Sequence, residues 1–343
     1  MSFTGGMALE PFFIGAAATG LSAGLTMLLR PLLARYAMAR PNARSSHKIP
    51  TPQGGGISVI SATLIVAAAA LFVDPNLGRD TSWDFAWIAA ATVVLAIVGA
   101  ADDIIVLDTV PRLVAQVLAV VVVVALLPTK TQIVSFLPWW MERALLLLAG
   151  VWFVNLVNFM DGIDWMTVAE VVPVTAGLLL LRTFEALPPL AALVALALLG
   201  AMIGFAPFNR PTAKLFLGDV GSLPIGLLLC WLLFLLAARG HVAAAILLPL
   251  YYIADTTIVL VRRTISGEPI TQAHRSHFYQ LATTRGFSVF QVVSRVFVVN
   301  VALVGLAVAT VAKPSLIMSV AALVLGSALV TWLLTVFARG TKQ

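Results

Sequence analysis

Charged side chains are scarce in this sequence. Asp, Glu, Lys and Arg make up 10% of its 343 residues, whereas hydrophobic residues make up 61%. Soluble domains carry about 25% charged residues, so a water-soluble globule, a disordered chain and a coiled coil are all excluded. Cysteine is almost absent, and the single Cys230 excludes a disulfide scaffold. Because there are also only four His residues, a zinc centre is not expected.

Basic residues are missing ahead of Arg30. A cleaved signal peptide begins with a basic segment, so we expect none here.

Apolar runs of membrane-spanning length fill the chain instead. A transmembrane helix needs about 20 apolar residues and tolerates about 17, and eleven runs reach or approach that length. The sequence therefore predicts an all-α polytopic membrane bundle of about 11 transmembrane helices, folded as a single domain over residues 1–343. The expected runs are 12–29, 57–73, 85–101, 113–127, 143–157, 166–181, 187–206, 222–238, 242–261, 290–311 and 315–337.

Lys and Arg are distributed unevenly between alternate loops. If the N-terminus lies outside, 15 of the 21 fall on the inner side and 6 on the outer side. Inner loops of membrane proteins are enriched in these residues, so we expect an N-out, C-in chain in the bacterial inner membrane, with its inner side cytoplasmic. The same rule accounts for the net charge of +6 without a nucleic-acid partner. The sequence leaves a homodimer open, because lipid-facing and partner-facing apolar surfaces look alike.

Unusual polar residues gather in the inner loops, where six of the ten Asp residues lie. The outer loops carry ordinary solvated residues. We therefore predict one polar site on the inner face, built from segments 44–56 (RSSHKIPTPQGGG), 102–112, 155–164, 209–222 and 274–280.

Oxygen-bearing side chains recur every three residues at the end of the fifth run. They are Asn155, Asn158, Asp161 and Asp164. Such ligands, with no cysteine, suit a hard divalent cation, Mg²⁺ or Mn²⁺. Asp219, in the segment FLGDVGS, adds a carboxylate beside glycines that would let a phosphate approach the backbone. The alternatives are a polar helix end that caps its own carbonyls, and an N-cap role for Asp219 or Ser222.

Two adjacent carboxylates, Asp102 and Asp103, end the third run. The negative end of the helix dipole disfavours them there, so a cation or a shifted pKa must offset them. A solvated pair is the alternative. Asp255, inside the ninth run, is either a functional intramembrane carboxylate or the partner of a nearby arginine.

Two basic loops complete the pattern. Candidate binding residues are Arg44, His47, Lys48, Thr51 and Gly55 in the first loop, and Arg275 and His277 in the last. Their cations, hydroxyl and glycine amides could surround phosphate groups, or the loops could only set the topology. Carboxylates beside cations suit phosphoryl transfer, in which a divalent ion bridges acidic side chains to a pyrophosphate.

As a set, five motifs resemble the signatures of the polyprenyl-phosphate N-acetylhexosamine-1-phosphate transferases, glycosyltransferase family 4. They are PTPQGGG, the Asp pair followed by Leu107, Arg112 and Gln116, NFMDGID, FLGDVGS and HRSHFYQ. The resemblance covers nearly the whole chain and is closest to bacterial enzymes that start O-antigen and related glycan synthesis. It implies transfer of a sugar-1-phosphate from a UDP-N-acetyl sugar to undecaprenyl phosphate, with Mg²⁺ as cofactor and UMP as the second product.

The resemblance also implies roles for individual residues. It assigns the metal to Asn158 and Asp219, the catalytic carboxylates to Asp102, Asp103, Asp161 and Asp164, and further substrate contacts to Arg112 and Asn155.

The sequence departs from the family pattern in two places. Many members have Gly after the DGID core, where this chain has Trp165, and many have further His residues where it has Tyr279 and Gln280. The absence of a His-rich loop argues against a muramoyl-pentapeptide substrate and leaves the sugar open.

Two other functions compete with the transferase. A transporter or lipid flippase usually has its ionisable residues near the membrane midplane, whereas here they gather at one face. A membrane phosphatase would share the cations but use water as the acceptor. We therefore predict the transferase.

Overall fold

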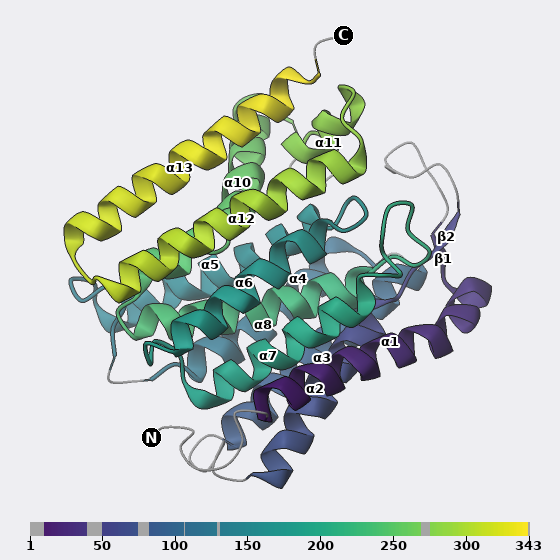
Figure 1. Cartoon of the computed structure of the whole chain (residues 1–343), viewed down its shortest axis with the longest axis horizontal. Helices are drawn as coiled ribbons and strands as arrows, with labels where there is room; N and C mark the ends of the chain where they lie inside the picture. The colour runs from purple at the N-terminus through teal and green to yellow at the C-terminus, as the bar shows by residue number, and fades with distance from the viewer. Residues whose placement is uncertain are drawn as a thin grey trace.

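The computed structural model describes residues 10–39, 50–74, 82–105, 107–128, 131–268 and 275–341 (Figure 1). These residues form 13 helices and one antiparallel pair of short strands, β1 (Met38–Ala39) and β2 (Thr51–Pro52). The first helices are α1 (Glu10–Tyr36), α2 (Gly56–Val73), α3 (Ser82–Ile105), α4 (Thr109–Ala125), α5 (Trp139–Met160) and α6 (Met166–Arg182). They are followed by α7 (Pro189–Phe205), α8 (Asp219–Ala238), α9 (Val242–Leu247), α10 (Leu250–Ile265), α11 (Phe278–Thr284), α12 (Val289–Ala312) and α13 (Leu316–Arg339).

Helices follow the predicted apolar runs. Each run contains one helix except the ninth, 242–261, which breaks at Leu248 and Pro249 into α9 and α10. Proline lacks an amide N–H and its ring clashes with the preceding turn, so the expectation of one continuous helix here is wrong. In the described part of the chain, seven helices are long and apolar enough to cross a membrane. The chain is an all-α, multi-pass membrane protein, while the total of about 11 spans and the N-out orientation stay predictions.

Helix α8 lies at the centre of the bundle, buried along almost its whole length (Figure 1). Glycines let its neighbours approach closely. A Cβ on Gly99 of α3 would overlap the Asp219 carbonyl, and one on Gly226 would lie 3.0 Å from the Cα of Val154 in α5. Close backbone packing is a main source of helix association in a membrane. The ends of α3 and α5 are thereby brought to the beginning of α8.

A glycine run packs the start of α2 against the same place. The amides of Gly55 and Gly56 donate to the carbonyls of Phe216 (2.9 Å) and Leu217 (2.8 Å). A Cβ on Gly56 would overlap the backbone of Gly221, so only glycine permits this contact. Because backbone carbonyls occupy these amides, our expectation that they cradle an anion, including a substrate contact at Gly55, is wrong.

Candidate active site

A polar pocket of about 160 Å³ lies where the ends of α3 and α5 meet the beginning of α8. Its polar lining comes from four of the five segments that the sequence singled out. These side chains are Gln53, Asp103, Asn158, Asp161, Asp164, Asn209 and Asp219.

Asp102 pairs with a cation. It accepts a hydrogen bond of 2.5 Å from Nη1 of Arg112 and one of 2.6 Å from the amide of Leu107. The same Nη1 lies 3.7 Å from Oδ2 of Asp219. Arg112 is therefore the cation that the negative end of α3 was expected to need, and it links that end to the pocket.

Asp103 caps a different helix. Its Oδ1 accepts from the amide of Asp219 (2.9 Å) and its Oδ2 from the amide of Val220 (3.2 Å), the first two amides of α8. The N-cap position itself is Gly218, with φ of 77° and no side chain to offer. The alternative that Asp219 or Ser222 caps α8 is therefore wrong, because a carboxylate from α3 does so.

Asn158 and Asp219 are held side by side. Nδ2 of Asn158 donates to Oδ1 of Asp219 (2.8 Å) and to Oγ of Ser222 (2.9 Å). Since both bonds use the amide nitrogen, the amide oxygen of Asn158 and the carboxylate of Asp219 are adjacent donors for a cation.

This donor set fits Mg²⁺, which takes one or two protein oxygens and completes its shell with water and phosphate oxygens. Among the residues that the structure describes, no three His, Cys, Asp or Glu side chains are arranged to enclose an ion.

Asp161 is a further carboxylate in the lining of the pocket. Burial raises the pKa of Asp161 to about 7, and the charges of Asp103 and Asp164 act in the same direction. The hydroxyl of Thr167 donates to Oδ1 of Asp161 at 2.5 Å, which opposes the rise. A cation nearby would favour the ionised carboxyl, so the electrostatics also fit a metal.

Trp165 follows Asp164 with a left-handed backbone, φ 63°. Glycine adopts this conformation most easily, which gives a physical reason for the Gly that the motif resemblance places at this position. Trp165 is held by two bonds, from its amide to Oδ1 of Asn209 (2.8 Å) and from its indole N–H to the Ala206 carbonyl (2.6 Å). Asp164 in turn accepts from the amide of Ala213 (2.9 Å), so the segment after α7 closes one side of the pocket.

Some expected substrate contacts lie away from the pocket. Asn155 donates to Oε1 of Gln116 (2.5 Å) and to the carbonyl of Val151 (2.8 Å), one turn before Asn158. Thr51 is buried in β2. Three further candidates, Arg44, His47 and Lys48, lie outside the described residues.

Of the last basic loop, the candidates Arg275 and His277 are described, and neither lines the pocket. His277 is only 2% exposed, and its Nδ1 lies 3.1 Å from Oδ1 of Asp255. Arg275 is half-buried. The alternative that Asp255 pairs with a nearby arginine is wrong, because its partner is His277 while Arg263 pairs with Glu268 (2.6 Å).

Sequence reasoning missed three polar residues of the site. Nε2 of Gln53 donates to the carbonyl of Asp103 at 2.5 Å, Asn209 holds Trp165, and Thr167 holds Asp161. Gln53 stands inside the PTPQGGG motif and could have been singled out. Asn209 begins the segment 209–222 that the sequence assigned to the site, although it was not named there as a site residue. Thr167 lies inside an apolar run, and no pattern marks it.

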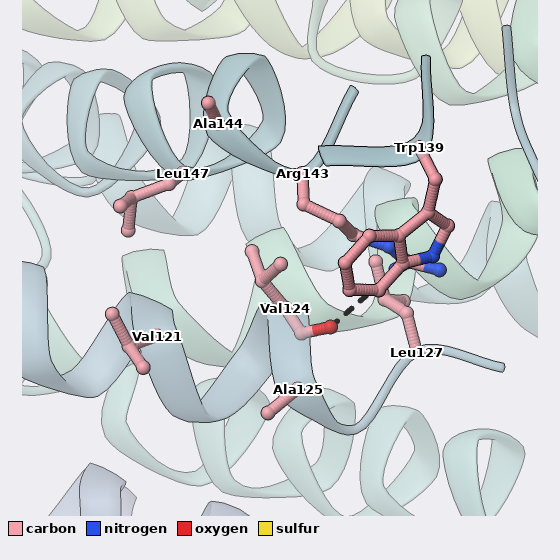
Figure 2. A pocket seen from close by; sticks show the side chains of 8 residues that line it. All are labelled: Val121, Val124, Ala125, Leu127, Trp139, Arg143, Ala144 and Leu147. Atoms are coloured by element: carbon pink, nitrogen blue, oxygen red, sulfur yellow. Dashed lines mark hydrogen bonds between the residues drawn. The ribbon is translucent and has the colours of Figure 1, made fainter. Parts of the chain in front are cut away.

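A larger apolar cavity of about 410 Å³ lies at the other end of α5 (Figure 2). Among the described residues that line it, the charged side chain is Arg143, which donates to the carbonyls of Val124 (3.4 Å) and Pro128 (3.0 Å) and lies 5.5 Å from the ring of Trp139. Trp139 and Asn158 are about 28 Å apart along the helix at 1.5 Å per residue. The described lining is apolar apart from an arginine that carbonyls occupy, so these residues offer no carboxylate or amide oxygen for a metal.

The part of the chain that carries most of the pocket matches a known protein family. Residues 85–237 match the family described as Glycosyl transferase family 4. The chain is 32% identical to a phospho-N-acetylmuramoyl-pentapeptide-transferase of Synechococcus sp. (strain JA-3-3Ab), over 89% of this chain and 96% of the relative.

Two further relatives carry other names. A decaprenyl-phosphate N-acetylglucosaminephosphotransferase of Mycolicibacterium smegmatis is 28% identical, over 81% of this chain and 77% of its own. A probable undecaprenyl-phosphate N-acetylglucosaminyl 1-phosphate transferase of Bacillus subtilis is 24% identical, over 76% of this chain and 75% of the relative. Since the match to the first relative spans nearly both chains and agrees with the motifs, the chain belongs to glycosyl transferase family 4.

Proposed function

We propose that this membrane transferase moves a sugar-1-phosphate from a UDP-N-acetylhexosamine to undecaprenyl phosphate, with release of UMP. The observation that carries the proposal is the pocket itself, in which Asn158 and Asp219 offer adjacent oxygens beside Asp161, Asp164 and the Asp102–Arg112 pair. Family membership and the names of the three relatives support the same reaction class.

Asn158 and Asp219 would hold Mg²⁺, with Mn²⁺ as a substitute. The cation, when bound, supplies charge stabilisation to the phosphates. The chain's own part is positioning. Asp103 fixes the first turn of α8 and with it Asp219, while Asp102 holds Arg112 at the pocket edge, where its guanidinium can attract a phosphate.

No strong base is required in this proposal. Both oxygens of Asp102 and both oxygens of Asp103 already accept hydrogen bonds. A phosphate monoester has its second pKa near about 6, so the acceptor lipid is largely dianionic at neutral pH. We therefore assign both carboxylates to orientation of the site and leave the attack to the ionised phosphate.

UDP-N-acetylglucosamine is the first donor to test, because two of the relatives carry N-acetylglucosamine in their names. A cytoplasmic active site in the bacterial inner membrane follows from the Lys and Arg distribution. A role at the start of O-antigen synthesis stays a prediction from the motif resemblance.

The test is an assay of purified protein with Mg²⁺, undecaprenyl phosphate and a panel of UDP-N-acetyl sugars. The proposal predicts UMP release that depends on the lipid and is lost in Asp219→Asn but not in Asp108→Asn. Release of free sugar phosphate without lipid would favour a phosphatase. Absence of turnover with every donor would favour a transporter or lipid flippase.

A further inference from the structure

Asp255 is a buried carboxylate that the proposed reaction does not use. It is 0% exposed in α10 and has four hydrogen-bond donors around it. They are Nδ1 of His277 (3.1 Å), the amides of Phe278 (3.1 Å) and Tyr279 (3.3 Å), and the hydroxyl of Tyr251 (3.3 Å). Burial of a carboxylate is costly without such partners. Three of the four donors belong to the beginning of α11.

Helix α11 depends on this carboxylate. It has seven residues, and its N-cap residue, His277, makes no side-chain cap bond. A helix of this length has little stability of its own, and unpaired amides at a buried helix start are unfavourable. Asp255 supplies the missing acceptor from α10, just as Asp103 of α3 does for α8.

Helix α11 in turn touches the end of α5. Tyr279 is fully buried, and its hydroxyl donates to the carbonyl of Phe159 at 2.9 Å. Phe159 directly follows Asn158 and belongs to the last turn of α5, where carbonyls lack partners within the helix. A Cβ on Gly162 would overlap the Tyr279 hydroxyl, so the DGID loop also rests on this side chain.

We propose that Asp255 is a positioning residue for the active site, which acts by anchoring α11 so that Tyr279 fixes the end of α5 that carries Asn158. His277 is part of this anchor and does not contact the nucleotide sugar, contrary to the sequence expectation. The inference rests on the proposed function for its metal site and its kinetics, but its first test needs no turnover.

The first test compares two Tyr→Phe variants of the full chain in detergent. Tyr279→Phe removes only the hydroxyl that bonds α5, whereas Tyr251→Phe removes a hydroxyl that bonds Asp255 and no atom of α5. The probe is Mn²⁺ alone, with free ion measured by electron paramagnetic resonance. Loss of one hydrogen bond predicts Mn²⁺ affinity roughly three- to ten-fold weaker in Tyr279→Phe, and a change of less than about two-fold in Tyr251→Phe, whose bond is peripheral.

Equal Mn²⁺ affinity in Tyr279→Phe and wild type would overturn the proposal. Failure of the wild type to bind Mn²⁺ would also overturn it, because no metal ligand would then exist at α5 to be positioned. If the Mn²⁺ pattern appears while the wild type shows no lipid-dependent UMP release, the proposed function fails and the positioning role stands.

The second test is a double-mutant cycle of Asp255→Asn and His277→Asn, which keeps neutral polar groups at both places. If Asp255 and His277 act together as one anchor, the double variant should lose about as much kcat/KM as the more damaging single variant. The losses should appear in kcat and in the Mg²⁺ concentration for half-activation, with the KM for the UDP-sugar unchanged. Losses that multiply, with a KM for the UDP-sugar raised by His277→Asn alone, would contradict the proposal and restore a direct contact.

Discussion

Replacement of Asp103 by alanine should weaken the fold and the metal site together. The carboxylate accepts hydrogen bonds from the amides of Asp219 and Val220, while the N-cap residue Gly218 has no side chain with which to cap α8. Removal of a cap acceptor and of a negative charge at a helix start costs about 1–3 kcal/mol. In Asp103→Asn, one oxygen still accepts, so the expected loss is about 1 kcal/mol.

The matched control for this prediction is Asp108, which occupies the N-cap position of α4 but makes no side-chain cap bond. Asp108→Ala should change the free energy of unfolding by less than about 0.5 kcal/mol. Unfolding is measured by SDS titration in mixed micelles. The Mg²⁺ concentration for half-activation is measured in the lipid-dependent assay, and this concentration should rise in Asp103→Ala because Asp219 loses its support. Equal stability of Asp103→Ala and Asp108→Ala would refute the capping argument.

Three further predictions concern the metal, the packing and the topology. Asp219→Asn should lower kcat by roughly 10²–10³-fold, the scale for loss of one electrostatic stabiliser, with thermal unfolding unchanged. Normal turnover would refute the metal assignment. Gly56→Ala should destabilise the protein by about 1–3 kcal/mol, because the added methyl group overlaps the start of α8. Gly20→Ala should leave the stability unchanged, because the space around Gly20 is open. SDS titration of both variants checks this prediction. Arg44→Cys and Gly267→Cys should react only with a thiol reagent that reaches the cytoplasm, and the natural Cys230 is buried and should stay silent; labelling from the periplasmic side would contradict the orientation.

Much of the fold could be predicted because apolar length is a strong signal. Every run except 242–261 became a single helix, since nothing within those runs competes with helix formation in lipid. Pro249 could have warned of the break in the ninth run, yet prolines also lie inside α1, α6 and α8 without ending them. A proline in an apolar run therefore does not by itself mark where a helix ends.

The acidic pocket was predictable because its residues cluster in a few inner segments. The hydrogen bonds that join those segments were not predictable from the sequence. Asp103 caps α8 across 116 residues of sequence, and Tyr279 bonds Phe159 across 120. A glycine run that approaches another backbone has the same composition as one that binds phosphate, so Gly55 was assigned to an anion. A histidine that serves a buried carboxylate, such as His277, likewise looks the same in sequence as one that serves a substrate.

The most direct measurement follows the β-phosphate of the donor. Purified protein is given UDP-N-acetylglucosamine labelled with ³²P in that phosphate, together with Mg²⁺ and undecaprenyl phosphate, and the products are separated into lipid and aqueous phases. The account predicts label in a lipid diphosphate sugar, formed in equal amount with unlabelled UMP. Label retained in aqueous UDP would mean that the sugar alone is transferred. Label in free sugar phosphate would mean hydrolysis, and either result would contradict the account.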